Sequence, residues 1–325
     1  MRLFTALRRP ALALFGAALV ACLALALAST AQARTDDRAK DVYWIHGFSH
    51  NESIDCAKEF AVMKERFRSW GFTGRWATVG YYTGDKNCTM AEGHGSYHSR
   101  HAGGHSRDRH TVNDPLEHIA YHLAWLIYDL STKHGRTVDV VAHSMGGLLI
   151  RYAIAQTRNH DPDFPPSLRI EDVVTMGTPH GGVRNSWLTI GCGTFAYQCR
   201  EMSAGSDFLK WLEDDDRNSN GWNPQSSVPT DWSTFGSDDD DFAAADRAAG
   251  TARDRSPSHD YIGSCHKTWY KTADDIEHGD FKTDASSALT ADVYRYNCNG
   301  GGWRSDPDSH WPIRRAARAL TLGTE

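Results

Sequence analysis

The sequence predicts an α/β fold with a minimal, mostly parallel sheet of about six strands and helices on both faces. Short apolar runs alternate along the chain with stretches of amphipathic helical spacing, the pattern of parallel strands joined by crossover helices. In addition, the segment VDVVAHSMGG (residues 138–147) places a serine between an apolar strand and a helix. Both observations are typical of a sheet whose strands carry catalytic residues at their carboxyl ends.

The expected elements follow from periodicity. Strands are expected at residues 41–46, 75–82, 138–142, 170–176, 230–236 and 265–270, with a further one at 292–297. Helices are expected at residues 57–70, 113–133, 148–157 and 314–320. The second helix begins with Asn113-Asp114-Pro115 and stops at Gly135, residues that favour helix starts and ends. Two aperiodic polar stretches, 85–110 and 213–229, predict long surface loops.

The first 33 residues have the features of a secretory signal peptide. Three arginines among the first nine residues precede an apolar stretch from Ala11 to about Ala28, and Ala31-Gln32-Ala33 forms a cleavage motif. We expect cleavage near Ala33, secretion, and one mature domain spanning 34–325. A membrane anchor is the alternative, but the apolar run is at the short limit for a span. A lipoprotein-type processing box at Cys22 is a second alternative.

The charge of the expected mature chain excludes some functions. Its net charge would be about −9, because the leading segment holds three arginines and no acid. An acidic chain argues against nucleic-acid binding. No other stretch is long and apolar enough to cross a membrane, so we expect no stable membrane insertion.

Six cysteines follow the signal, an even number that predicts three disulfides in a secreted chain. Six cysteines allow 15 pairings, and pairing of neighbours is the simplest guess. That guess gives Cys56–Cys88, Cys192–Cys199 and Cys265–Cys298. No C-x-x-C spacing is present, which disfavours a metal–thiolate site.

The strand–serine–helix segment carries the chemistry. A nucleophilic serine must stand on a sharp turn so that its hydroxyl is exposed above the sheet, and small neighbours such as Ala142 and Gly146 let the strand and helix approach there. The sequence A-H-S-M-G-G around Ser144 resembles the nucleophile turn of the α/β-hydrolase superfamily, in particular of small secreted bacterial lipases and esterases. His46-Gly47-Phe48 is similar to their oxyanion loop, and residues 177–182 (GTPHGG) are similar to another of their segments.

The resemblance implies a Ser-His-Asp triad in the chain order Ser, Asp, His. Asp239 in TFGSDDDDF fits the spacing of the family's acid, with Asp240 and Asp238 as alternatives. His278 in E-H-G-D-F resembles the histidine that serves as base, with His310 as the alternative. The oxyanion hole would be formed by the backbone N–H groups of Phe48 and Met145.

Five histidines, His94, His98, His101, His105 and His110, lie in a segment rich in glycine and serine. Histidine-rich tracts can bind metal ions, but the glycines disfavour a helix that would align the ligands. We therefore favour a soluble loop over the substrate entrance, and we expect neither a metal nor a cofactor. His143 and His180 are expected to line the site without taking part in the chemistry.

These features predict a secreted carboxylic-ester hydrolase, a lipase or esterase, with an ester or lipid substrate and transient contact with lipid interfaces. An acyltransferase or amide hydrolase with the same triad is the alternative, and a non-catalytic binding protein on this fold is a more remote one. The residues do not determine an oligomeric state. Five aromatic residues could form a lipid-facing cap or ordinary core: Trp187, Phe195, Tyr197, Phe208 and Trp211.

Overall fold

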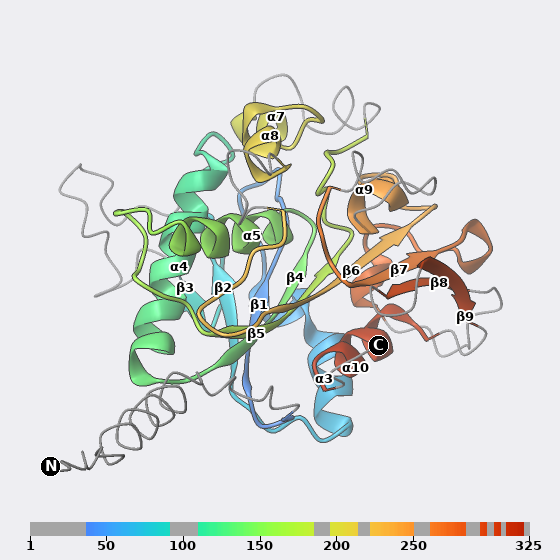
Figure 1. Cartoon of the computed structure of the whole chain (residues 1–325), viewed down its shortest axis with the longest axis horizontal. Helices are drawn as coiled ribbons and strands as arrows, with labels where there is room; N and C mark the ends of the chain where they lie inside the picture. Colours follow the sequence, from blue (N-terminus) through green and yellow to red (C-terminus); the bar gives the residue numbers. More distant parts are fainter. Residues whose placement is uncertain are drawn as a thin grey trace, which may run out of the picture. The chain divides into compact units, whose positions relative to one another are not determined.

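A nine-stranded sheet with the strand order β3-β2-β1-β4-β5-β6-β7-β8-β9 runs through the computed structural model (Figure 1). The structure describes residues 37–91, 110–184, 196–213, 222–249, 261–283, 293–297, 302–306 and 310–321. All of these belong to one unit, Asp36–Glu325. The strands are β1 (Asp41–Ile45), β2 (Trp76–Gly80), β3 (Met90–Ala91), β4 (Val138–His143), β5 (Ile170–Met176), β6 (Asp231–Ser237), β7 (His266–Tyr270), β8 (Val293–Asn297) and β9 (Gly302–Asp306).

The predicted fold class is confirmed. Six strands of five or more residues, β2, β1, β4, β5, β6 and β7, pair in parallel and form the centre of the sheet. The two-residue strand β3 extends one edge in parallel. At the other edge, β8 and β9 pair antiparallel as a hairpin. The strands β3 and β9 were not expected from the sequence.

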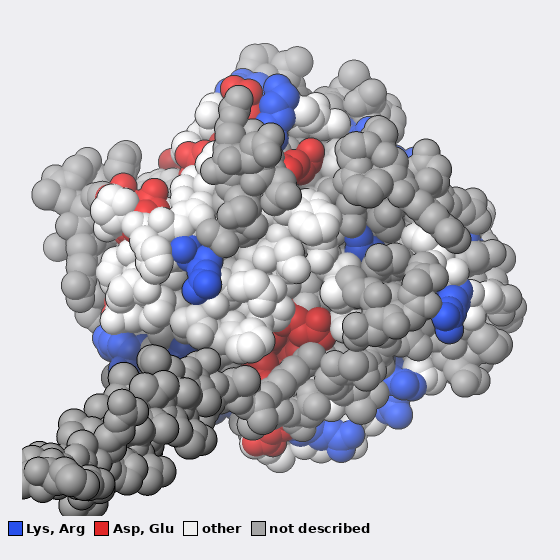
Figure 2. Space-filling model, viewed as in Figure 1, with Lys and Arg blue, Asp and Glu red and all other residues white. Residues whose placement is uncertain are grey.

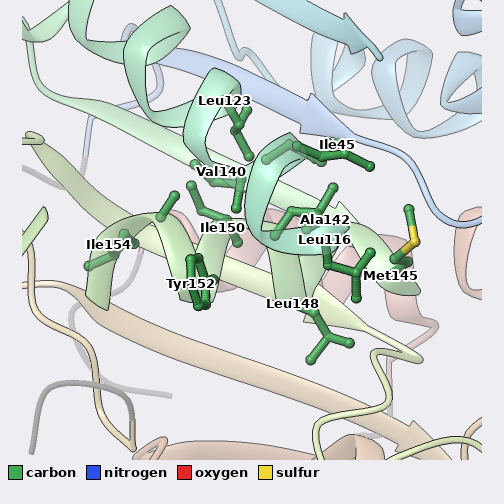
Figure 3. Packing of buried hydrophobic residues seen from close by; sticks show 14 of the residues in the cluster. Ile45, Leu116, Leu123, Val140, Ala142, Met145, Leu148, Ile150, Tyr152 and Ile154 are labelled. Atoms are coloured by element: carbon green, nitrogen blue, oxygen red, sulfur yellow. The ribbon is translucent and has the colours of Figure 1, made fainter. Parts of the chain in front are cut away.

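Helices cover both faces of the sheet, and residue alternation along the strands decides which core each side chain enters. On β1, Tyr43 and Ile45 join one buried cluster, while Val42 and Trp44 join the other. The first cluster packs against α4 (Leu116–Leu130) and α5 (Met145–Arg158), as Figure 3 shows for strand and helix side chains from Ile45 to Ile154. The second packs against α3 (Ala61–Ser69) and α10 (Pro312–Ala319).

The helix expected at residues 57–70 is interrupted. It consists of α2 (Cys56–Glu59) and α3, separated at Phe60, whose backbone leaves the helical region (φ −120°, ψ 24°). The helix after residue 113 begins later than expected, because Pro115 is its N-cap and Asp114 instead accepts hydrogen bonds from Thr111. Short helices α7 (Tyr197–Glu201), α8 (Asp207–Glu213) and α9 (Ala245–Ala249) lie within the stretch between β5 and β7.

Buried charges lie at the amino ends of the central strands. Lys40 Nζ lies 2.9 Å from Asp139, 3.2 Å from Glu171 and 3.0 Å from Asp172, and all four side chains are buried. This explains Asp139, the one acid in strand β4. Because parallel strands carry catalytic groups at their carboxyl ends, we interpret this cluster as structural.

No helix among the described residues is both long and apolar enough to span a membrane. On the face drawn in Figure 2, the described lysine and arginine side chains form several separate patches. A continuous basic stripe, the usual footprint of a nucleic-acid-binding surface, is therefore not a feature of the described residues on that face.

Candidate active site

Ser144 lies on a strained turn between β4 and α5. Its backbone has φ 55° and ψ −133°, a conformation that costs a non-glycine residue about 1–3 kcal/mol. Three hydrogen bonds hold the turn: the Ser144 amide donates to the Met176 carbonyl (2.9 Å), and the Ser144 carbonyl accepts from Thr178 Oγ1 (2.8 Å) and the Gly147 amide (3.1 Å). The hydroxyl therefore stands at the start of α5, where the helix dipole favours negative charge.

Two glycines allow the chain after β1 to approach this turn closely. A Cβ atom on Gly47 would lie 2.5 Å from Ser144 Cβ and 3.0 Å from Ser144 Oγ. A Cβ atom on Gly146 would lie 2.5 Å from the His46 carbonyl oxygen. Real Cβ contacts are longer than this, so the loop His46-Gly47-Phe48 can face the serine only because these positions carry no side chain.

A buried network holds that loop. The Asp85 carboxylate lies 3.0 Å from His46 Nε2 and accepts from the Tyr81 and Tyr82 amides (2.8 Å each). Burial acts to raise the pKa of Asp85, but the hydrogen bond and charge of His46, together with the two amides, hold it below the usual value. The Tyr81 hydroxyl donates to the carbonyls of His46 (2.6 Å) and Gly47 (3.0 Å).

Sequence reasoning did not identify Asp85 or Tyr81. The only signal was the position of Asp85 just beyond the strand that pairs with β1. Phe48, the residue expected to supply one oxyanion N–H, comes directly after His46 and Gly47 in the chain. It is half-buried against the larger core cluster. Met145, expected to supply the other, is the first residue of α5. Their role as donors stays a prediction.

The carboxylate beside His278 is Asp240. His278 Nδ1 lies 3.0 Å from Asp240 Oδ1 and 2.9 Å from Oδ2. Asp240 is completely buried, and its Oδ1 also accepts from the amides of Phe242 (2.8 Å) and Ala243 (2.9 Å). The His278 side chain remains 20% exposed, so the carboxylate fixes the ring while solvent can still reach it.

The other two aspartates face elsewhere. Asp239, favoured on sequence spacing, is half-buried, and its pKa is raised by burial and by the charges of Asp275 and Asp238. Asp238 accepts from Trp269 Nε1 at 2.7 Å and lies 3.5 Å from Lys271 Nζ. We therefore replace Asp239 with Asp240 as the acid paired with His278. The turn after β6 decides this, because it buries the third of four successive aspartates.

Three other histidines considered from the sequence, His143, His180 and His310, contact neighbouring residues of the fold. His143 Nε2 lies 2.8 Å from the His278 carbonyl, and burial keeps its pKa well below the usual value, so the neutral ring donates this bond and supports the His278 loop. His180 contacts Thr175 and Arg151. His310, the alternative base, contacts Arg318 at 2.7 Å.

The aromatic residues of the expected cap are partly core. Phe208 is buried, and Trp211 packs against the same cluster; their rings contact Tyr152 with centroids 5.4 and 4.7 Å apart. Tyr197 is exposed. Trp187 and Phe195 lie outside the described residues, as do His94, His98, His101 and His105.

The structure contains a disulfide between Cys56 and Cys88, the first of the expected pairs. Cys199 and Cys265 are also disulfide-bonded. Their expected partners, Cys192 and Cys298, lie outside the described residues.

Residues 106–216 match the model of a protein family described as "Putative serine esterase (DUF676)". The matched segment includes β4, Ser144, α5 and β5, whereas Asp240 and His278 lie beyond it. No curated protein sequence matches the chain.

The chain is similar to several solved structures, including the following three. The mature lipase BlEst2 of Bacillus licheniformis is 15% identical, with 76% of this chain and 88% of that chain covered and a TM-score of 0.44. Lipase B of Aspergillus fumigatus is 14% identical, with 65% and 40% covered and a TM-score of 0.42. The product of the lin2722 gene of Listeria innocua is 11% identical, with 88% and 95% covered and a TM-score of 0.42. This chain thus spans about 40% of the length of the Aspergillus lipase.

Proposed function

We propose that this chain, which has an α/β-hydrolase fold, is a serine carboxylic-ester hydrolase of the lipase or esterase type. In this proposal Ser144 is the nucleophile, His278 the general base and Asp240 the residue that orients the base. The observation that carries it is the contact between His278 Nδ1 and Asp240 Oδ2, which lie 2.9 Å apart. Asp240 follows strand β6 and His278 follows strand β7, and these two strands are parallel. Ser144 follows β4, so all three residues follow the carboxyl ends of parallel strands in one sheet.

The geometry of the pair supports specific roles. A carboxylate only accepts hydrogen bonds, so His278 Nδ1 carries the hydrogen in its bond to Asp240. The Nε2 atom then has the lone pair that can remove the Ser144 proton as the hydroxyl attacks an ester carbonyl. The negative oxygen of the tetrahedral intermediate would be stabilised by the N–H groups of Met145 and Phe48.

The remaining steps use the same residues. Protonated His278 donates this proton to the oxygen of the leaving alcohol as the ester C–O bond breaks, and the acyl group stays on Ser144 Oγ. Water, deprotonated by His278, then attacks the acyl-enzyme and releases the acid while Ser144 regains its proton. The family model that covers the Ser144 segment supports an esterase of this kind.

We also propose that the enzyme acts outside the cell after cleavage near Ala33. The support comes from the signal-like first 33 residues and from the disulfides, which form and persist in oxidising compartments. Mass spectrometry of culture supernatant, with the N-terminus sequenced, would test this directly. An intact N-terminus retained in the cell membrane would contradict it.

The decisive test of the activity is the substitution Ser144→Ala. Loss of the nucleophilic serine lowers kcat roughly 10⁶-fold in subtilisin, a comparable triad enzyme. We expect Ser144→Ala to hydrolyse p-nitrophenyl esters no faster than background and to resist labelling by a fluorophosphonate. The exposed Ser69→Ala is the matched control. Unchanged hydrolysis by folded Ser144→Ala would refute the proposal.

A chain-length series defines the substrate class. Soluble p-nitrophenyl esters from two to sixteen carbons would be compared with emulsified triglyceride. A preference for long chains with activation at the interface indicates a lipase, and a preference for short soluble esters indicates an esterase. Acyl transfer to an added alcohol in preference to water would indicate the acyltransferase alternative.

A further inference from the structure

Three histidine side chains converge where the chain enters α4. His110 precedes the helix, while His118 and His122 lie four residues apart on it and therefore share one face. Each offers one ring nitrogen to a group whose atoms all lie within 4.8 Å of one another. The Nε2 atoms of His118 and His122 are 2.9 Å apart. The triad uses none of these residues.

The surroundings fix the ring of His110 for ligation. Its Nδ1 atom lies 3.2 Å from the Tyr81 carbonyl. A carbonyl can only accept, so Nδ1 carries the hydrogen and Nε2 keeps the lone pair. Metal-binding histidines commonly donate their second N–H to a backbone carbonyl in this way, which sets the tautomer and the ring orientation.

Two of the three rings are buried, and burial disfavours the charged form of an imidazole. His110 is 2% exposed and His122 6%. A neutral imidazole is the form that binds a divalent metal, because a protonated one has no lone pair to offer.

The distances between the three ring nitrogens fit a single tetrahedral zinc ion. Three nitrogens bonded at 2.0–2.1 Å in a tetrahedral zinc site are about 3.3 Å apart. The observed separations, from 2.9 Å to at most 4.8 Å, bracket that value, so small side-chain rotations suffice. The simpler interpretation is a cluster of neutral rings joined by hydrogen bonds, but such a cluster does not require one nitrogen of every ring to lie within 4.8 Å of the other two.

We propose that His110, His118 and His122 bind one zinc ion through their ring nitrogens, at a stabilising site separate from Ser144. The ion would tie α4 to the end of β2. The His110 amide donates to the Tyr81 carbonyl at 2.7 Å, and the Tyr81 hydroxyl donates to the loop beside Ser144. Zinc would thereby rigidify the support of that loop without touching the substrate.

This proposal differs from the expectation for the histidine-rich segment, in which we predicted no metal. Only His110 belongs to that segment. Its other members, His94, His98, His101 and His105, lie outside the described residues. Their substitution is the matched control, because it tests whether the other histidines of this segment bind metal.

Zinc binding can be measured without reference to activity. The full mature protein would be purified without a histidine tag, stripped with a chelator and titrated with Zn²⁺ against a chromophoric competitor. Bound zinc would be counted by mass spectrometry of the metal, and thermal midpoints recorded with and without it. The variants are His118→Gln/His122→Gln and the four-residue change His94→Asn, His98→Asn, His101→Asn, His105→Asn.

We expect one zinc per wild-type chain and a thermal midpoint that rises with zinc concentration. The four-residue variant should behave like wild type, and His118→Gln/His122→Gln should lose affinity by about a hundred-fold or more. If that double variant does not fold, His118→Gln alone, at a half-buried position, is compared instead. The proposal is overturned if wild type binds no zinc, if the ligand variants bind as tightly, or if the four-residue variant loses the ion.

Discussion

The Nδ1 atom of His278 lies 2.9 and 3.0 Å from the two carboxylate oxygens of the buried Asp240. Asp240 Oδ1 also accepts from two amides of the following turn, so the carboxylate cannot rotate away without breaking those bonds. This arrangement predicts which of the successive aspartates matters for activity.

Replacing Asp240 with asparagine should abolish most activity while leaving the fold intact. The asparagine oxygen can still accept from the Phe242 and Ala243 amides, but its NH₂ group then faces His278 Nδ1 and imposes the wrong tautomer. The equivalent change in chymotrypsin-type proteases lowers kcat about 10⁴-fold, and we expect a similar loss here. Steady-state hydrolysis of a p-nitrophenyl ester measures it.

Asp239→Asn is the matched control for this prediction. Its side chain is half-buried and belongs to the neighbouring residue of the same turn, so we expect activity within about two-fold of wild type. A large loss in Asp239→Asn with normal activity in Asp240→Asn would show that the spacing argument from sequence was correct and that our assignment is wrong.

Gly47→Ala should impair catalysis by displacing the loop beside Ser144, the proposed nucleophile. The added methyl would meet Ser144 Cβ at 2.5 Å, and the loop is held by Tyr81 and therefore has little room to move. A displacement on the order of 1 Å at a reacting centre can cost about 10²-fold in rate. We expect a loss in kcat of that order.

Gly279→Ala tests whether any glycine substitution near the site has this effect. Gly279 has helical backbone angles (φ −74°, ψ −25°), and a methyl group added to it would have nothing within 4 Å. We expect full activity and a slightly higher free energy of unfolding, by about 0.4–1 kcal/mol. Equal kinetic losses in both variants would remove the support for a specific contact between Gly47 and Ser144.

The central strands could be predicted because their burial leaves a simple pattern. The strand expected at residues 170–176 is β5 without change, since every residue in it is buried on a two-sided parallel sheet. The break at Phe60 could not be predicted, because the apolar spacing of Phe60, Met63 and Phe67 continues through it. The backbone leaves the helical conformation at Phe60, while Phe60, Met63 and Phe67 all stay buried in the same cluster.

Some residues of the candidate site could be predicted from the sequence and others could not, for a physical reason. Ser144 and His278 each stand in a distinctive local sequence, whereas Asp238, Asp239 and Asp240 are identical in type, and only the turn decides which one is buried. The contacts among Asp85, His46 and Tyr81, and those among His110, His118 and His122, join separate segments of the chain. Periodicity within one segment carries no information about such contacts.

The buried Glu201 should make stability depend on pH. Its carboxylate accepts from the Leu116 amide at the start of α4 (2.8 Å). Burial raises its pKa from 4.5 to about 7, with the charge of Glu117 adding to the effect. The folded state therefore holds a proton that the unfolded state releases between pH 4.5 and 7. Consequently the free energy of unfolding should fall as pH rises through this window, by about 2–3 kcal/mol from this group.

Glu201→Gln isolates that contribution, because glutamine is neutral at every pH and keeps an oxygen that can accept from the Leu116 amide. We expect the variant to be more stable than wild type by about 2 kcal/mol at pH 8 and nearly equal to it at pH 4.5. Denaturant unfolding at several pH values measures the difference. The exposed Glu65→Gln should follow the wild-type curve. If Glu201→Gln instead loses stability at pH 8, the ionised carboxylate is stabilising, and burial does not dominate at this position.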